Sequence, residues 1–281
     1  MDADLDIPVL DDHMHLDPVN GRGADAASEF ADHGGTHLLV VNKPSWTLVE
    51  AATDESTFRE TFELTIEVAA AASERLPGAA WPVLGVHPAL ISKLVEAGYE
   101  PRAAAEIMQA GLDVAAEFVA DGPALALKSG RPHYEVDDAV WDASNDVMRH
   151  AFALGSEVGC PVQLHTEAGE DFGEVADWAE AAGLPRGQVV KHYAGGRLEG
   201  PVKSVISHTD ELETAVEADE PFLMETDFLD DPDRPGAVLG IKTVPRRVRW
   251  LLEAGHEAAV RRAHVETPAS VYGVDTEATL D

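Results

Sequence analysis

Short apolar runs alternate with longer helix-like stretches along the chain, and the alternation repeats eight times. The runs cover residues 7–15, 36–43, 81–87, 124–130, 161–167, 188–195, 202–208 and 221–227. The stretches between them carry apolar residues at helical spacing, as Val147, Ala151 and Leu154 do, and Gly159 is placed to end that helix. Strands that alternate with helices in this way pair in parallel and are buried on both faces.

Eight such units in 281 residues predict an α/β fold, a single (β/α)8 TIM barrel that occupies residues 1–281 as one domain. A doubly wound open sheet is the alternative. Such a sheet binds nucleotides through a glycine-rich turn after its first strand, whereas the chain reads DDHMHLD at that point. The barrel is therefore the predicted architecture.

The composition excludes several classes of protein. The first residues lack the basic segment of a signal peptide, and no apolar stretch approaches the roughly 20 residues that cross a membrane. The single cysteine, Cys160, cannot form an intramolecular disulfide or a cysteine-rich zinc site. We therefore expect a cytoplasmic protein with no membrane partner.

The charge balance is strongly acidic. Asp and Glu number 52 against 20 Lys and Arg, which gives a formal net charge of −32. Repulsion among so many carboxylates destabilises a compact chain in dilute salt, and molar salt screens it. The composition favours a halophilic protein, with an acidic surface that selects cationic partners as the alternative. Duplex nucleic acid is disfavoured because the chain has no basic stripe.

Side chains able to bind metal stand at the carboxyl ends of the runs. His13 and His15 end the first run, and their spacing places both imidazoles on one face of a strand, where they can share a divalent ion. Further runs end in Lys128, His165, His192 and Asp227. All strand ends of a barrel open on one face, so these side chains are expected to converge. Histidine and carboxylate suit zinc foremost, with manganese, nickel, iron or magnesium as alternatives.

Several segments resemble the TatD-related metal-dependent hydrolases of the amidohydrolase superfamily. They read, in order, VLDDHMHLD, GVHP, VQLHTEAG, VVKHYAGG and FLMETDFLDDP. HVETPASVYGV is similar to the terminal helix of those proteins, so the resemblance runs from Asp11 to about Val274. GRPHY at residues 130–134 resembles an archaeal-type branch. The resemblance implies a barrel that holds one or two divalent ions.

The resemblance also implies which residues bind the ions. They would be His13, His15 and Asp227 for the first ion, His165 and His192 for the second, and a fourth-strand residue as a bridge. The family resembled here carries glutamate at that bridge. This chain carries Lys128, and an ammonium group has no lone pair for a metal.

Three interpretations of Lys128 are open. Carbamylation by carbon dioxide, which the wider superfamily uses on the same strand, would make it a carboxylate ligand. That reaction needs a neutral amine, and burial lowers the pKa of a lysine. Alternatively, Lys128 stays cationic and replaces the second ion. In the third interpretation catalysis is lost, and the barrel binds a metal or metabolite without turnover.

The implied chemistry is hydrolysis. A divalent ion activates water for attack on a phosphorus or carbonyl centre, and Asp227 is the predicted catalytic residue that accepts the proton. Glu225 stands two residues before Asp227 and so faces the same side of the strand, and it is expected to orient a metal ligand. The resemblance implies nuclease or phosphodiesterase activity on single-stranded nucleic acid or a small molecule. A carbamylated Lys128 favours an amidase, lactonase or phosphotriesterase-like activity instead.

Candidates for substrate binding lie near the strand ends: His87, Arg131, His133 and Tyr193. The guanidinium of Arg131 could pair with an anionic substrate group or with one of the many local carboxylates. Tyr193 could donate to a leaving group or simply pack. His87 could line the pocket or hydrogen bond within its own turn.

Overall fold

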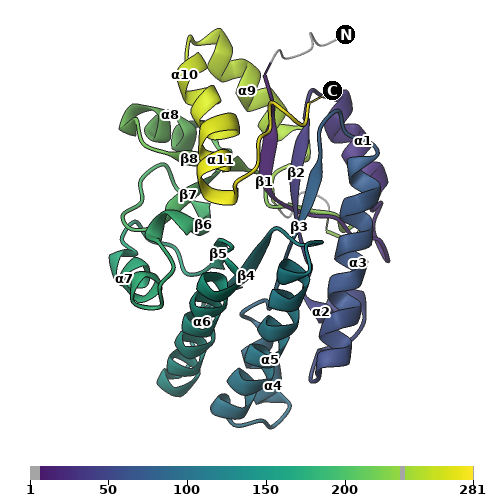
Figure 1. The fold of residues 1–281 in the computed structure, drawn as a ribbon, viewed down its shortest axis with the longest axis vertical. Coiled ribbons are helices and arrows are strands. Elements are labelled where there is room, and N and C mark those ends of the chain that lie inside the picture. The colour runs from purple at the N-terminus through teal and green to yellow at the C-terminus, as the bar shows by residue number, and fades with distance from the viewer. Residues whose placement is uncertain (1–6, 235–237, 281) are drawn as a thin grey trace.

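The computed structural model describes residues 7–234 and 238–280. All eight predicted strands, β1 to β8, are present (Figure 1). A ninth, very short strand follows them in the chain. Their bounds are β1 (Leu10–His15), β2 (His37–Val41), β3 (Ala80–Gly85), β4 (Ala126–Gly130), β5 (Val162–His165), β6 (Val189–Ala194), β7 (Val202–Ile206), β8 (Phe222–Glu225) and β9 (Phe228–Leu229). Every pairing is parallel, and the order is β8-β7-β6-β5-β4-β3-β2-β1-β9. The predicted barrel is confirmed.

The barrel closes through a break in its last strand. β8 pairs with β7, and β9, two residues further on, pairs with β1. The carboxylate of Asp11 spans the seam, because it accepts hydrogen bonds from the backbone N (3.2 Å) and the hydroxyl (2.7 Å) of Thr226. Asp227, the second residue of the break, has a positive φ of 49°. The kink therefore lies at Asp227, a predicted metal ligand.

Helices cover the outside of the sheet (Figure 1). Their bounds are α1 (Ala24–Asp32), α2 (Ser45–Leu48), α3 (Glu55–Ser73), α4 (Leu90–Glu96), α5 (Pro101–Ala120), α6 (Asp138–Val158), α7 (Gly173–Ala181), α8 (Thr209–Ala218), α9 (Thr243–Glu253), α10 (Glu257–Arg261) and α11 (Thr267–Tyr272). α6 ends at Gly159 in the left-handed conformation, as its sequence predicts. None of the helices in the described part of the chain has the length and apolar character needed to cross a membrane.

The strict alternation of strand and helix fails once. The segment between β6 and β7, residues 195–201, contains no helix. It reads GGRLEGP, and glycine and proline are the poorest helix formers. The prediction of eight unbroken strand–helix units is therefore wrong at this position.

The interior of the barrel is apolar at one end and polar at the other. An apolar floor is built from side chains of the strands, the end of α11 and the segment after it; its members include Leu10, Leu39, Val83, Val190, Leu223, Tyr272 and Val274. Polar and charged side chains fill the layers above it, among them Asp12, Lys128, Gln163, His192, Ser204 and Glu225, all buried. The floor leaves the carboxyl ends of the strands as the open face of the barrel.

Candidate metal centre

A β-bulge in β1 brings the side chains of the consecutive residues Asp12 and His13 into the same polar interior of the barrel. Asp11 pairs with Leu38 and Met14 pairs with Val40, so β1 has one residue more than β2 between these pairs. Bulges of this kind re-aim side chains and are frequent next to active sites. His13, inside the bulge, reaches across the barrel to Gln163 of β5, with 2.9 Å between Nδ1 and Oε1.

Three side chains from β1, β6 and the β8–β9 break form the candidate centre. One ligand atom each of His13, His192 and Asp227 lies within 4.8 Å of the others. The rings of His13 and His192 stack with their centroids 3.7 Å apart, and His15 Nε2 lies 3.5 Å from Asp227 Oδ1. Within residues 7–234 and 238–280, no other group of three such side chains meets the same distance.

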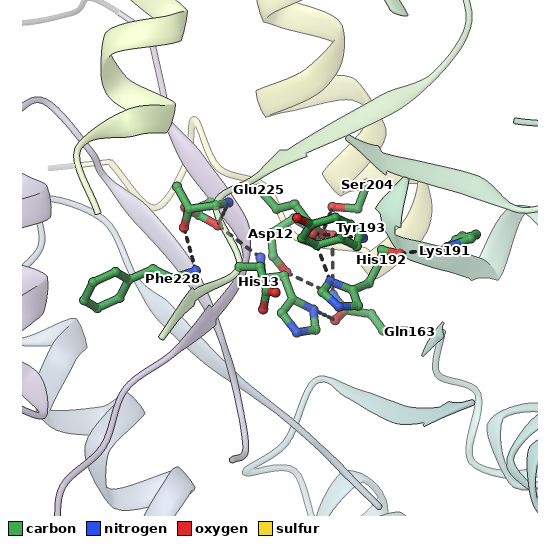
Figure 2. A network of polar contacts seen from close by, with 12 residues as sticks. Asp12, His13, Gln163, Lys191, His192, Tyr193, Ser204, Glu225 and Phe228 are labelled. Carbon is green, nitrogen blue, oxygen red and sulfur yellow. Dashed lines mark hydrogen bonds and ion pairs between the residues drawn. The ribbon is translucent and has the colours of Figure 1, made fainter. Parts of the chain in front are cut away.

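Two of the imidazoles are held with one particular nitrogen facing the centre. His15 Nδ1 donates to the carbonyl oxygen of Val41 at 2.8 Å, and this oxygen can only accept. His192 Nδ1 donates to Glu225 Oε1 at 2.9 Å (Figure 2). Glu225 is fixed in turn by the hydroxyl of Ser204 at 2.5 Å. Each ring therefore carries its hydrogen on Nδ1 and keeps a lone pair on Nε2.

This donor set fits a divalent ion. Metal-binding histidines ordinarily donate their second nitrogen to a carboxylate or carbonyl, as His15 and His192 do here. Imidazole nitrogens and a carboxylate oxygen are ligands of zinc and of manganese, iron or nickel. His13, His15, His192 and Asp227 are the side chains that would hold the ion.

The charges at the centre agree with this assignment. Burial lowers the pKa of His192 to about 3, and burial together with the charges of His192 and Lys128 lowers the pKa of His13 well below its usual value. Neutral imidazole is the form that binds metal. Burial acts to raise the pKa of Asp227, but the hydrogen bond with His15 and the charges of His192 and Lys128 outweigh it and lower that pKa. Asp227 is therefore ionised at neutral pH.

Lys128 lies inside the centre, where only 1% of it is exposed. Its Nζ is 3.2 Å from His13 Nε2, the atom that would ligate an ion. Burial lowers the pKa of Lys128 to about 8, against the opposing charges of Asp227 and Glu225. Near neutral pH, Lys128 can therefore exist both as a cation and as a neutral amine.

His165 lies next to the centre and engages a different partner. Its Nε2 is 2.9 Å from Nδ1 of His133, and its ring centroid lies 4.8 Å from that of His87 and 5.4 Å from that of His192. The resemblance implied a second ion on His165 and His192. That assignment stays a prediction, and in the structure the ligand atom of His192 also lies within 4.8 Å of those of His13 and Asp227.

A cleft of about 320 Å³ opens over the centre. Its walls bring together most of the predicted metal-site residues with further side chains from the loops: His15, Lys43, Trp46, His87, Lys128, His165, His192, Asp227, Leu229, Asp231 and Arg234. Lys43 is neutralised by Asp17, with 2.5 Å between Nζ and Oδ2. His87 thus lines the cleft, as one of its two predicted roles requires.

The other substrate-binding candidates lie elsewhere. Arg131 is buried and forms an ion pair with Glu167, while its Nη1 donates to Asn145 at 3.0 Å. Its guanidinium also lies 4.3 Å from the centroid of Trp141. Local pairing therefore occupies Arg131 in this structure.

Tyr193 and His133 are exposed at the rim. Tyr193 has a positive φ of 54°, and 48% of it is exposed. Its backbone N donates to Glu225 Oε1 at 2.9 Å, so the residue helps to fix the carboxylate that orients His192. His133 bonds His165 and packs its ring against Tyr134.

Sequence reasoning missed two features of the site. Trp46 forms part of the cleft wall from α2, a short helix without a recognisable pattern. Gln163 bonds His13 from within an apolar run. Gln163 is recognisable in the sequence as a polar residue in the apolar run PVQLH. It stands two positions before His165 and so faces the same side of the strand.

Comparison with known proteins places this geometry in a family. The chain matches the family described as TatD related DNase over residues 10–273. It is 33% identical over 289 residues to an uncharacterized protein of Methanocaldococcus jannaschii, covering 99% of this chain and all of the relative.

Solved structures share the fold. A TatD homologue of Escherichia coli K12 superimposes with a TM-score of 0.61 at 17% identity, covering 95% of this chain and 98% of that one. A TatD-like protein of Archaeoglobus fulgidus gives 0.57 at 16% identity, over 94% and 100% of the two chains. A lactonase of Listeria monocytogenes gives 0.58 at 13% identity, over 95% and 94%. The family in general depends on divalent metals, and on the family match the chain belongs to the TatD-related hydrolases.

Proposed function

We propose that the chain is a divalent-metal-dependent hydrolase that cleaves small esters at a phosphorus or carbonyl centre. The observation that supports it is the cluster of His13, His192 and Asp227, with His15 beside it, all at the open end of the barrel. A divalent ion bound there supplies a Lewis acid that polarises the substrate and activates water.

Asp227 is the proposed proton acceptor. It lines the cleft, and its neighbours His15 and His192 keep it ionised despite its burial. A carboxylate in this position can take a proton from the attacking water while it holds that water in place. His15 and His192 themselves are fixed by Val41 and Glu225, so the geometry around Asp227 needs little reorganisation.

We propose that Lys128 stays cationic and stands in for a second ion. Its Nζ lies 3.2 Å from His13 Nε2, and the negative charges of Asp227 and Glu225 favour its cationic form. An ammonium beside the scissile bond would stabilise negative charge as the reaction proceeds.

A second candidate is a carbamylated-lysine hydrolase of the lactonase or phosphotriesterase type. The observation that favours it is the lowered pKa of Lys128, about 8, because only the neutral amine reacts with carbon dioxide. The two candidates differ in the number of ions that each chain binds.

The size and lining of the cleft favour a small molecule or a single strand of nucleic acid as the substrate. At about 320 Å³ it has the size of small-molecule sites. Trp46 and Leu229 give it apolar walls, and Arg234 adds a cation that can pair with an anionic group. On a chain with a net charge of −32, long polyanions would be repelled outside the cleft.

The test is a substrate panel in molar salt with zinc or manganese. It contains an aryl phosphomonoester, an aryl phosphodiester, a lactone, a carboxylic ester and a single-stranded oligonucleotide. We expect metal-dependent hydrolysis of at least one small ester, abolished by chelator and restored by metal. A metal-loaded protein that cleaves none of them would contradict the proposal and favour a binding barrel without turnover.

A further inference from the structure

We propose that Gln163 is a positioning residue that sets the tautomer of His13, and thereby leaves the correct nitrogen of that histidine for metal. Figure 2 shows Gln163 beside the ring of His13 and joined to it by a hydrogen bond. The identity of what His13 binds rests on the proposed function. The tautomer itself is a property of the protein without metal.

The orientation of the Gln163 side chain follows from its partners. The residue is fully buried on β5. One end of its amide lies 3.0 Å from the backbone oxygen of Asp12 and 2.8 Å from the hydroxyl of Tyr272. A backbone carbonyl oxygen can only accept a hydrogen bond, so this end must be the NH2 group. The opposite end is then the amide oxygen.

That amide oxygen decides where His13 carries its hydrogen. It lies 2.9 Å from His13 Nδ1, and since an amide oxygen only accepts, Nδ1 must donate. A neutral imidazole has one ring hydrogen, so Nε2 is left with a lone pair. Lys128 Nζ lies 3.2 Å from Nε2, and in its ammonium form, which can only donate, it fits the same tautomer. Two contacts on opposite sides of the ring therefore agree.

Tyr272 anchors the arrangement from behind. Its hydroxyl accepts from Gln163 and is also hydrogen bonded to the carboxyl of Asp12. A buried amide without partners is costly, and here its NH2 group and its oxygen are both satisfied. Because flipping the amide would place its oxygen against the oxygen of Asp12, only one orientation is stable.

The first measurement is the tautomer of His13 in metal-free protein, from its ring-nitrogen chemical shifts. We expect the hydrogen on Nδ1 in the wild type. Gln163→Met keeps the length and removes the acceptor, so Nε2–H should become populated. Zinc affinity by titration calorimetry should then fall about 10- to 100-fold, as for other residues that orient metal ligands.

Two further variants separate positioning from packing. Gln163→Glu can donate to Asp12 from a protonated carboxyl and still accept from His13, so it should restore the tautomer and most of the zinc affinity. Ser129→Ala is the matched control on β4. Its hydroxyl is buried without a hydrogen-bond partner among the described residues, and its loss should change neither readout.

Nε2–H as the main tautomer in the wild type would overturn the inference, as would wild-type zinc affinity in a folded Gln163→Met variant. If that variant does not fold, the wild-type tautomer and Gln163→Glu decide. A wild type with Nδ1–H on His13 that binds no zinc would instead refute the proposed function and leave the positioning role standing.

Discussion

Replacing Asp227 by asparagine removes the proposed proton acceptor but keeps an oxygen that can ligate metal. We expect kcat to fall about 10²- to 10⁴-fold, while bound metal decreases much less. The measurement pairs kcat on the best substrate of the panel with metal per chain. Asp231→Asn, on the wall of the same cleft, is the control and should retain most activity. Unchanged turnover in Asp227→Asn would remove it from that role.

Lys128→Glu introduces the bridging residue that the resembled family carries. If Lys128 is the cation that replaces an ion, the wild type binds one ion per chain and the variant binds two, because a carboxylate can bridge where an ammonium cannot. Elemental analysis distinguishes these counts. Two ions in the wild type, falling to one in buffer free of carbon dioxide, would show that Lys128 is carbamylated.

At the scale of single residues, the sequence predicted where the site side chains lie better than it predicted which of them are in contact. Strand-end parity indicated that His13, His15, His192 and Asp227 would lie at one end of the barrel, and they do. Which ligand atoms meet depends on local backbone details, such as the bulge in β1 and the positive φ of Asp227. No spacing rule in the sequence encodes these.

The junction of β3 and β4 tolerates no side chain at Gly85. A Cβ there would lie 1.8 Å from the carbonyl oxygen of Lys128. Gly85→Ala should therefore push the strands apart and lower the free energy of unfolding by about 3 kcal/mol. Gly187→Ala, where a Cβ meets nothing within 4 Å, should change it by no more than about 0.5 kcal/mol. Equal urea midpoints for the two variants would contradict the packing argument.

His264 ties the segment before α11 to β1. Its Nδ1 accepts from the backbone N of Leu10 at 3.1 Å, and burial lowers its pKa to about 3. Since the unfolded chain protonates this histidine near its ordinary pKa, its contribution to stability is complete above about pH 6.5 and is lost as the pH falls toward 3.

His264→Asn keeps an acceptor for Leu10 but does not titrate. Between about pH 8 and pH 5, the stability of the wild type relative to this variant should fall by about 2 kcal/mol. Urea unfolding at the two pH values measures the difference. A difference that does not depend on pH would show that folding does not shift the pKa of His264, which would contradict this account.

At the scale of elements, the apolar runs predicted all eight main strands, because burial on both faces leaves a strong sequence signal. The glycines and proline of GGRLEGP indicate that this segment forms no helix. The prediction failed there because it assumed a helix after every strand. β9 could not be predicted. Phe228 and Leu229 become a strand only because the kink at Asp227 turns them onto β1.

Most of the lysine side chains are buried. Four of the six are buried: Lys43, Lys128, Lys191 and Lys203. Arg131 is buried as well, and five acidic residues balance these five basic ones in the interior: Asp11, Asp12, Asp17, Glu225 and Asp230. Burial among the described residues therefore leaves the acidic excess, a net charge of −32, at the surface. Raising potassium chloride from about 0.1 M to about 2 M shortens the Debye length from about 10 Å to below 3 Å, so repulsion among these carboxylates should be screened.

We expect that change in salt to raise the melting temperature by at least about 2 °C, equivalent to about 1 kcal/mol. Thermal unfolding of metal-free protein measures it, and the absence of metal separates screening from ligand binding. A melting temperature that is constant or falls with salt would contradict a halophilic adaptation.

Metal bound per chain tests the central claim most directly. The protein is purified without chelator in molar salt at neutral pH, incubated with zinc or manganese, freed of excess metal and analysed for its elements. We predict one ion per chain, lost in His192→Ala and retained in His208→Ala, whose side chain is exposed at the start of α8. No bound metal in the wild type, or equal metal in the two variants, would contradict a centre built on His13, His192 and Asp227.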